Sequence, residues 1–239
     1  MRFLIPPTHE GEQMALDAER SHYLCKVLRK RQGEEIACFD GQGGTFTARV
    51  VQAHAKHATL EILATEATAT ALKPAVHLGL SILKGQAMDR ALQQATELGA
   101  SEITLLNAKR CNVNLKSDRA DNKLQHWRKI VAGACEQCGQ LFLPKVNPPM
   151  TVAEFVSLHT GTCIVLDQNA PALPSTLHAD KLSVLIGPEG GWDPSETGLF
   201  DEHQLARYCV APLTLRAETT PAVALAVINH AYNSVAAGN

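Results

Sequence analysis

Three glycines, a proline and a glutamate occupy five consecutive positions directly after a short apolar stretch. Gly187-Pro188-Glu189-Gly190-Gly191 follows Leu182–Ile186, which is apolar apart from one serine. Glycines at the carboxyl end of a parallel strand let a ligand approach the backbone closely, where side chains would block it. The pattern therefore favours a ligand-binding turn in which Glu189 is the only ionisable side chain. The alternative is a plain strand-to-helix turn.

A second polar segment, Leu213–Pro221, also lies between an expected strand and an expected helix. Arg216 and Glu218 stand just before that helix, whose free N–H groups favour an anion or a polar ligand edge. An extended connection would point both side chains the same way, because alternate residues share a face. We therefore expect a cation and a carboxylate side by side. The alternatives are solvated charges beside a helix cap and a simple ion pair that fixes the loop.

Charge is distributed unevenly along the 239 residues. The formal net charge is −2, yet residues 105–145 carry +5 and residues 146–202 carry −7. This balance excludes a uniformly basic nucleic-acid coat protein but leaves room for local basic patches. Two stretches, Lys26–Arg31 and Lys109–Lys129, favour contacts with phosphates. The alternative is a pair of solvated helix surfaces.

Several familiar active-site motifs are missing from the sequence. It contains no dinucleotide-binding or P-loop glycine motif, no zinc-protease motif and no nucleophile elbow. Cys135 and Cys138 form the spacing of a redox or metal pair, but a structural zinc site needs four ligands. The seven cysteines are best interpreted as reduced thiols in the cytoplasm, without a metal. No apolar run approaches the ~20 residues of a membrane-spanning helix, and the N-terminus is too short in its apolar part for a signal peptide.

The first 70 residues are expected to form mainly short strands, which a small barrel would bury economically. An Asp-Gly turn joins two of these strands as a hairpin. We expect strands at Arg2–Ile5, Glu35–Phe39, Thr45–Val51 and Ala58–Leu63, and a helix over Asp17–Lys30. The stretch Ala67–Pro74 has no amphipathic pattern, so we divide the chain into domains of residues 1–70 and 74–239.

After this boundary, apolar strands alternate with helical patterns, which predicts a mostly parallel sheet covered by helices on both faces. The expected strands are His77–Leu83, Glu102–Leu106, Cys163–Asp167, Ser183–Gly187 and one near Tyr208–Pro212. Helices are expected over residues 88–98, around residues 124–134, after the caps Thr151 and Asp193, and from Pro221 to about Ser234.

Taken together and in order, these segments resemble the SPOUT class of methyltransferases, and specifically the RsmE family, over essentially the whole chain. The family methylates ring nitrogen 3 of a uridine in small-subunit (16S) ribosomal RNA. The residues that carry the resemblance are His22 with Val27-Leu28-Arg29, Phe39-Asp40-Gly41, Thr96–Gly99, Arg110-Cys111, Ala134–Gly139, Leu185–Gly191 and Leu215–Thr219. The chain departs from the family at Gln140, where an arginine is usual, and at Ala211-Pro212, where a glycine is usual.

The resemblance implies an N-terminal PUA-like β-barrel for RNA and a C-terminal SPOUT α/β domain with a deep trefoil knot. It implies that S-adenosylmethionine (SAM) is bound at the knot by three loops. The implied cofactor-binding residues are Leu166, Asp167, Gln168, Gly187, Pro188, Glu189, Gly190, Gly191, Leu213, Leu215, Arg216, Ala217 and Glu218. It also implies a homodimer that acts on 16S ribosomal RNA within an assembled or nearly assembled small subunit.

Methylation of a uracil ring nitrogen requires removal of its proton before or during attack. We expect Glu218 and Glu189 as candidate bases, with Glu136 and Glu97 as weaker choices, and Arg216 as the stabiliser of the uracil anion. The residues expected to contact RNA are Arg2, His22, Lys26, Arg29, Lys30, Arg31, Lys84 and Arg110. The alternative function is a non-catalytic RNA-binding module for ribosome assembly, which would need the basic residues but not the glycine turn.

Overall fold

The computed structural model describes residues 1–113 and 117–236, with side chains left undescribed at 117–119 and 233–236. Its contacts divide the chain into two compact units. The N-terminal unit comprises Met1–Ala71 and Cys135–Leu143, and the C-terminal unit comprises Leu72–Ala134 and the chain from Pro144 onward. The sequence carries no signal for the return of residues 135–143 to the first unit. Of the expected basic residues, Lys116 lies outside the described part of the chain.

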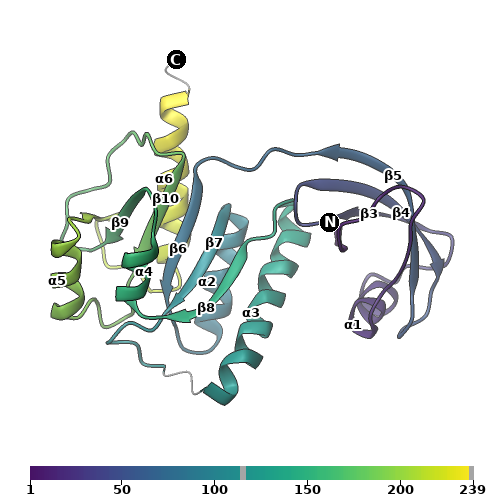
Figure 1. Cartoon of the computed structure of the whole chain (residues 1–239), viewed down its shortest axis with the longest axis horizontal. Coiled ribbons are helices and arrows are strands. Elements are labelled where there is room, and N and C mark those ends of the chain that lie inside the picture. The colour runs from purple at the N-terminus through teal and green to yellow at the C-terminus, as the bar shows by residue number, and fades with distance from the viewer. Residues whose placement is uncertain (114–116, 237–239) are drawn as a thin grey trace. The chain divides into compact units, whose positions relative to one another are not determined.

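The N-terminal unit is built around a curled five-stranded sheet (Figure 1). Its strands lie in the order β1-β3-β4-β5-β2, with β1 parallel to β3 and the remaining pairs antiparallel. The elements are β1 (Phe3–Leu4), β2 (Gln13–Ala15), α1 (Ala18–His22), the π-helical turn η1 (Tyr23–Val27), β3 (Glu35–Phe39), β4 (Gly44–Gln52) and β5 (Thr59–Thr68). Three register shifts in the β4–β5 pairing accompany the curl. The sheet forms a PUA-like half-barrel, which confirms the small β-domain predicted from the sequence.

Alternation along β4 and β5 explains why this sheet closes around a core. Phe46, Ala48 and Val50 are buried on one face of β4, and Leu60 and Ile62 meet them from β5. The hairpin turn is held by Asp40, whose Oδ1 accepts the N–H groups of Gln42 and Gly44 at 2.7 and 2.9 Å.

The returning segment 135–143 is fixed to the N-terminal unit through Glu136, which is only 2% exposed. Its Oε1 accepts a hydrogen bond from the Leu4 N–H at 2.9 Å and one from the Arg20 guanidinium at 2.6 Å. That guanidinium also lies 3.9 Å above the centre of the Phe3 ring. Because this carboxylate is buried and accepts two hydrogen bonds, Glu136 has a structural role here.

The C-terminal unit contains a six-stranded sheet in the order β11-β9-β10-β6-β7-β8. Every neighbouring pair is parallel, as the alternating pattern predicts. The strands are β6 (Ala75–Ser81), β7 (Ala100–Leu106), β8 (Lys145–Met150), β9 (Thr162–Leu166), β10 (Lys181–Ile186) and β11 (Ala206–Tyr208). The helices are α2 (Gln86–Glu97), α3 (Ser117–Cys138), α4 (Val152–Leu158), α5 (Pro194–Glu202) and α6 (Thr220–Ala236).

Helices cover both faces of this sheet (Figure 1). On β10, Val184 and Ile186 face the core formed with α2, α3 and α6, whereas Leu185 faces the core formed with α4 and α5. This alternation explains why buried parallel strands read as continuously apolar sequences. Among the described residues, no helix combines the length and apolar character that crossing a bilayer requires.

Local signals place most of these helices correctly. Thr151 with Glu154 and Asp193 with Glu196 form the complete capping boxes at the starts of α4 and α5. Two strands escaped prediction, the short edge strand β2 and the edge strand β8. The latter contains Pro148 and Pro149, which interrupt a strand pattern in sequence but are tolerated at a sheet edge.

Candidate cofactor and RNA sites

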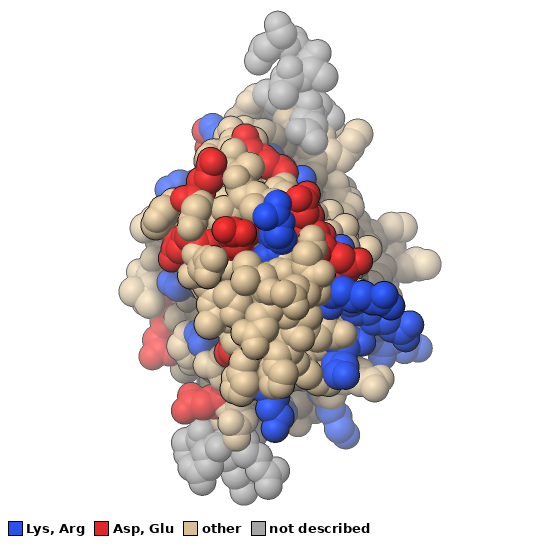
Figure 2. Space-filling model, turned by 90° about the vertical axis from the view of Figure 1, so that its right-hand side faces the viewer, with Lys and Arg blue, Asp and Glu red and all other residues tan. Residues whose placement is uncertain are grey.

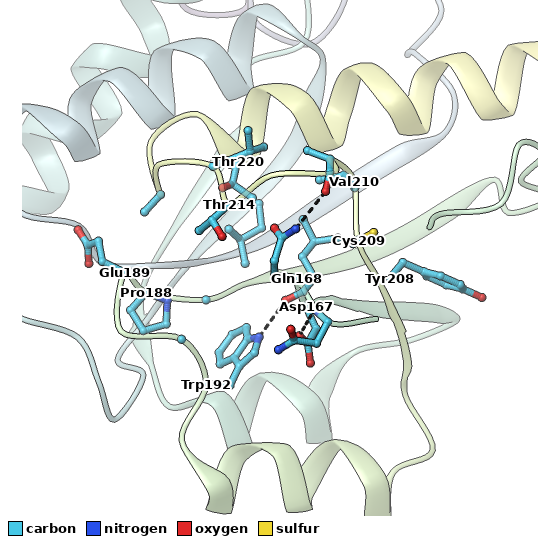
Figure 3. Close-up of a pocket in the computed structure, with 18 of the residues that line it drawn as sticks. Asp167, Gln168, Pro188, Glu189, Trp192, Tyr208, Cys209, Val210, Thr214 and Thr220 are labelled. Carbon is cyan, nitrogen blue, oxygen red and sulfur yellow. Dashed lines mark hydrogen bonds between the residues drawn. The ribbon is translucent and has the colours of Figure 1, made fainter. Parts of the chain in front are cut away.

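Three loops meet at the carboxyl ends of the neighbouring strands β11, β9 and β10, where they enclose a cavity of about 440 Å³. Ligands bind at this end of open parallel sheets as a rule. The lining residues are Arg110, Leu166, Asp167, Gln168, Asn169, Ile186, Gly187, Pro188, Glu189, Gly191, Trp192, Thr197, Tyr208, Cys209, Val210, Ala211, Thr214, Leu215, Ala217 and Thr220. Figure 3 shows ten of these residues labelled around the cavity.

The loop after β9 is tied to the segment after β11 by hydrogen bonds from both backbone and side chain. The Asp167 N–H donates to the Tyr208 carbonyl at 3.0 Å, and the Gln168 amide donates to the Ala211 carbonyl at 3.2 Å (Figure 3). Within the loop, the Asn169 N–H donates to Asp167 Oδ1 at 2.9 Å. These bonds fix two walls of the cavity relative to each other.

The glycine turn forms a third wall, and two of its glycines are required for different reasons. A Cβ atom on Gly187 would lie 3.0 Å from the Trp192 indole, closer than real Cβ contacts ordinarily come. Gly191 adopts the left-handed region at φ +70° and donates its N–H to the Pro188 carbonyl at 2.9 Å. The turn thus presents backbone to the cavity.

Trp192 lies at the centre of this arrangement, although sequence analysis did not select it. Its Nε1–H donates to the Leu166 carbonyl at 3.0 Å, and its ring meets Phe200 edge-on with centroids 5.1 Å apart. It therefore links the end of β9 to the glycine turn and α5 (Figure 3). A large aromatic residue directly after three glycines is the sequence signal that could have revealed it.

The segment before α6 differs from the extended connection that the sequence suggested. The N–H groups of Thr219 and Thr220 both donate to the Arg216 carbonyl, at 2.9 and 3.1 Å, so residues 216–219 form a turn. Alternation of side chains does not apply within such a turn, and the expectation that Arg216 and Glu218 lie side by side for that reason is wrong. Within the described part of the chain they form no ion pair with each other.

The cavity gathers nine of the thirteen residues that the resemblance assigned to the cofactor. The other four, Gly190, Leu213, Arg216 and Glu218, do not line it. Leu213 and Arg216 are exposed, whereas Glu218 is half-buried. Glu189 is exposed at the rim of the cavity (Figure 3). The charged candidates therefore stand at the edge of a cavity whose interior is mainly backbone and uncharged side chains.

Arg110, selected from the sequence as an RNA contact, is one of the residues that line this cavity. Its guanidinium donates to the Gly190 carbonyl at 3.2 Å, and its Nε lies 3.6 Å from Asp193 Oδ2. Lys84, another expected RNA contact, is exposed in the loop after β6, also at the carboxyl end of the sheet. Of these two cations, Lys84 lies outside the residues that line the cofactor cavity.

The remaining basic candidates belong to the N-terminal unit. His22, Lys26, Arg29 and Arg31 are exposed, while Arg2 and Lys30 are half-buried. Figure 2 views the molecule from the right-hand side of Figure 1. On that face, Lys and Arg side chains gather on one side and Asp and Glu side chains on another. Among the described residues, the side chains of Lys26, Arg29 and Arg31 have no acidic partner, so their charge remains available to phosphates.

The two weaker base candidates and the Cys-x-x-Cys pair lie outside the cofactor cavity. Glu136 is engaged by Arg20, and Glu97 accepts a hydrogen bond from Gln93 at 2.8 Å on the surface of α2. Burial raises the pKa of the Cys135 thiol to about 12, which keeps it protonated and unreactive. Among the described residues, no group of three or more His, Cys, Asp or Glu side chains is arranged to hold a metal ion.

Comparisons with known proteins agree with this architecture. A model of an RNA methyltransferase domain matches residues 70–229, and a model of an RNA methyltransferase PUA domain matches residues 16–63. The chain is 32% identical over 225 residues to the ribosomal RNA small subunit methyltransferase E of Synechocystis sp., covering 90% of this chain and 72% of the relative.

Two solved structures resemble the whole chain. A ribosomal RNA small subunit methyltransferase E from Neisseria gonorrhoeae, bound to SAM, is 31% identical, with a TM-score of 0.88 and 97% of each chain covered. A protein from Legionella pneumophila, solved with the bound cofactor SAM, is 29% identical, with a TM-score of 0.88 and 95% of each chain covered. The fold and the cavity are those of a two-domain RNA methyltransferase. Within that class, the chain belongs to the ribosomal RNA small subunit methyltransferase E (RsmE) family.

Proposed function

We propose that this protein transfers a methyl group from SAM to ring nitrogen 3 of a uridine in 16S ribosomal RNA. The observation that carries the proposal is the cavity at the carboxyl ends of β9, β10 and β11, whose wall at Gly187 has no room for a side chain because a Cβ there would lie 3.0 Å from the Trp192 indole. Its volume of about 440 Å³ lies within the range of cofactor pockets.

The residues present fit the chemistry of SAM. The N–H groups of Thr214 and Leu215, which line the cavity, have no acceptor within the described part of the chain and can bind polar ligand edges. Asp167 and Gln168 add side-chain oxygens, and Trp192, Leu166 and Ile186 add apolar surface. Bound there, SAM would supply an electrophilic methyl group.

The chain's own contribution is to position the uracil and to remove its N3 proton. Glu218 and Glu189 are the proposed bases, and Arg216 stabilises negative charge on the deprotonated ring. These three side chains lie at or beside the rim of the cavity. That position suits a uracil that leaves its stack in the RNA and enters the cavity from outside. Arg110, joined to the Gly190 carbonyl, is proposed to hold an RNA phosphate near the same rim.

RNA binding is proposed to be shared between residues 1–70, acting as the RNA-binding domain, and residues 74–239, acting as the methyltransferase domain. The free charges of Lys26, Arg29 and Arg31 support the first role, and Lys84 and Arg110 support the second. The substrate is proposed to be an assembled or nearly assembled small subunit in the cytoplasm.

A trefoil knot in the C-terminal unit is also proposed. Residues 167–180 connect the parallel strands β9 and β10, and Leu173 and Leu177 of this crossover pack against the core that includes Leu225 and Ile228 of α6. The Leu177 N–H donates to the Ala231 carbonyl of α6 at 3.3 Å. These contacts support the passage of α6 between the sheet and the crossover.

We further propose a homodimer that covers the outer side of α6. Ala224, Leu225 and Ile228 face the core, but Val223 and Val227 remain half-exposed and Ala226 is exposed. A helix that is apolar on most sides is stabilised by being covered on more than one side. Light scattering at low micromolar concentration should give about twice the 25.8 kDa chain mass. A monomer mass would contradict the dimer.

Calorimetric titration with SAM separates this function from a non-catalytic RNA-binding module. We expect saturable binding by the wild-type protein, with the cavity accepting one cofactor per chain. A protein that binds 16S RNA but does not bind SAM would instead be an assembly module.

A further inference from the structure

The glycine turn has a second neighbour besides the cofactor cavity, namely the loop that follows β7. Gly187, Pro188 and Gly191 line the cavity, whereas Gly190 does not. Gly190 packs instead against Arg110 of that loop: a Cβ added at Gly190 would lie 3.2 Å from the Arg110 Cβ and 3.5 Å from its carbonyl oxygen. Glycine at position 190 thus gives the loop room to approach the turn closely.

The peptide group between Gly190 and Gly191 joins the two neighbours. Its N–H, which belongs to Gly191, donates to the Pro188 carbonyl at 2.9 Å, and its carbonyl, which belongs to Gly190, accepts a bond from the Arg110 guanidinium at 3.2 Å. Because a peptide group is planar, its N–H and its carbonyl cannot turn independently. The orientation that closes the turn onto Pro188 is therefore the one that binds Arg110.

Arg110 is placed where it can contact both the cofactor and the RNA. It lines the cofactor cavity, yet its side chain is 46% exposed. The bond to Gly190 uses one of several N–H groups of the guanidinium, so others can bind an RNA phosphate. A phosphate bound to Arg110 and a cofactor bound against the turn would thus be connected through one side chain and one peptide group.

The backbone before Arg110 is fixed by a buried carboxylate, that of Glu196 in the first turn of α5. Glu196 is 5% exposed, and its two oxygens accept the N–H groups of Lys109 and Asp193, each at 2.9 Å. The Lys109 ammonium donates a further bond of 2.6 Å to the Ser195 hydroxyl. Lys109 is therefore attached to α5 through its main chain and its side chain, which fixes the point from which the Arg110 side chain extends.

The capping box of α4 shows that a helix can begin without such an attachment. Glu154 holds the same position in that box as Glu196 holds in the box of α5. It is exposed, and its Oε2 accepts bonds from the N–H and the hydroxyl of Thr151 at 2.7 and 2.8 Å. Glu196 combines the local capping bond with a bond to a residue 87 positions away. Because burial of a carboxylate is costly unless its oxygens are paired, this second bond indicates a role beyond helix capping.

We propose that Glu196 is a positioning residue that couples the binding of SAM to the binding of RNA. It holds Lys109 so that Arg110 meets the Gly190 carbonyl, and each ligand then stabilises the same arrangement of turn and loop. A ligand that finds this arrangement already fixed loses less freedom on binding, so each ligand should raise the affinity of the other. The coupling rests on the proposed function, because it takes SAM and small-subunit RNA as the two ligands.

Equilibrium dialysis with labelled S-adenosylhomocysteine (SAH), which carries no transferable methyl group, tests the coupling in the full-length protein. The dissociation constant of SAH is measured with and without a saturating amount of purified small subunits that lack the modification. In the wild-type protein, the subunits should tighten SAH binding about fivefold or more. Filter binding of the subunits, with and without saturating SAH, should give the same factor, because coupling between two binding sites is reciprocal.

Glu196→Gln keeps the shape of the side chain but leaves one carbonyl oxygen for the two N–H groups of Lys109 and Asp193. The coupling factor should fall below twofold, although the variant still binds SAH and the subunits separately. Glu154→Gln, which changes the same position in the capping box of α4, is the matched control and should keep the wild-type factor. A weaker affinity for either ligand alone, with an unchanged coupling factor, would give Glu196 a merely structural role and overturn the proposal.

Gly190→Ala gives a second test that leaves the capping box of α5 intact, and it decides the matter if Glu196→Gln fails to fold. Its new methyl group would lie 3.2 Å from the Arg110 Cβ and should displace the arginine from the turn, which lowers the coupling factor below twofold. Gly198→Ala, where a Cβ would meet nothing within 4 Å, is its control. The proposal is overturned if SAH and subunits bind the wild-type protein independently, or if either variant, once shown to be folded, keeps the wild-type coupling factor.

Failure of the proposed function would give a different result from failure of the coupling. A protein that binds no SAH, or no small subunits, would overturn that function and the coupling with it. Binding of both ligands without an effect of one on the other would overturn the coupling alone.

Discussion

The cofactor cavity and the basic surface of the N-terminal unit are built on opposite principles. The cavity is formed mainly by main-chain atoms and uncharged side chains, and it is held by bonds such as Asp167 N–H to the Tyr208 carbonyl at 3.0 Å. The basic surface is formed by long, exposed side chains, of which Lys26 and Arg31 have no acidic partner among the described residues. Ligand binding in the cavity should therefore be sensitive to small changes of shape. RNA binding on the basic surface should be sensitive to charge and to salt concentration.

The charged residues at or beside the cavity rim do not fit this comparison, because they are charged but belong to the cofactor site. Their removal should have the largest effect, and that effect should be on the methylation rate. Arg216→Ala and Glu218→Gln should each lower the single-turnover methylation rate about 10²–10³-fold, because each removes a group proposed to act on the uracil. SAM affinity should change much less. Quenched-flow assays with saturating RNA and cofactor give the rate. A fall below tenfold in both variants would assign proton removal to another group.

Inside the cavity, SAM affinity should depend mainly on shape. Gly187→Ala adds a methyl group 3.0 Å from the Trp192 indole and should weaken SAM binding roughly tenfold to a hundredfold. Gly198→Ala in α5 is the matched control, because its new Cβ would meet nothing within 4 Å. Calorimetry measures both. Equal SAM affinities in the two variants would show that SAM binding does not require glycine at position 187.

On the basic surface, RNA affinity should depend mainly on charge. The combined variant Lys26→Ala, Arg29→Ala and Arg31→Ala should bind RNA more weakly and reduce the slope of log K against log salt by roughly 0.7–0.9 per lost phosphate contact. SAM binding should stay unchanged. Lys56→Ala, on the loop between β4 and β5, controls for a general loss of charge. An unaltered salt slope would show that these cations face solvent alone.

Backbone strain at Arg29 offers the subtlest test of the comparison. Arg29 follows η1 in the left-handed region at φ 56°, where glycine is usual, and Lys30 N–H closes the turn on the Leu24 carbonyl at 3.0 Å. Arg29→Gly should be about 1 kcal/mol more stable than Arg29→Ala, although both lose the same charge. Urea unfolding checks this. Equal stabilities would mean that the turn relaxes without glycine.

Local patterns in the sequence predicted much of the fold, because they depend on neighbours along the chain. The capping residues Thr151 and Asp193, the hairpin turn at Asp40 and the apolar alternation of the parallel strands each report on a few adjacent positions. The order of the strands and the edge strand β8 depend instead on distant pairing. No local pattern indicated that pairing.

The candidate site shows the same division between features that depend on adjacent residues and features that depend on distant ones. The glycine turn is visible in the sequence because its glycines are adjacent, whereas Trp192 joining the Leu166 carbonyl and Arg110 joining the Gly190 carbonyl bring together residues far apart in the chain. The turn at Arg216 was missed because two successive N–H groups close on one carbonyl, which the polar sequence did not distinguish from an extended segment.

Methyl transfer to purified small subunits that lack the modification tests the central claim most directly. The subunits are incubated with the protein and isotopically labelled SAM, and the 16S RNA is digested to nucleosides and analysed by mass spectrometry. The account predicts label in 3-methyluridine, with little transfer by Arg216→Ala. Label in a different nucleoside, or no transfer by a protein shown to bind both SAM and the subunit, would contradict it.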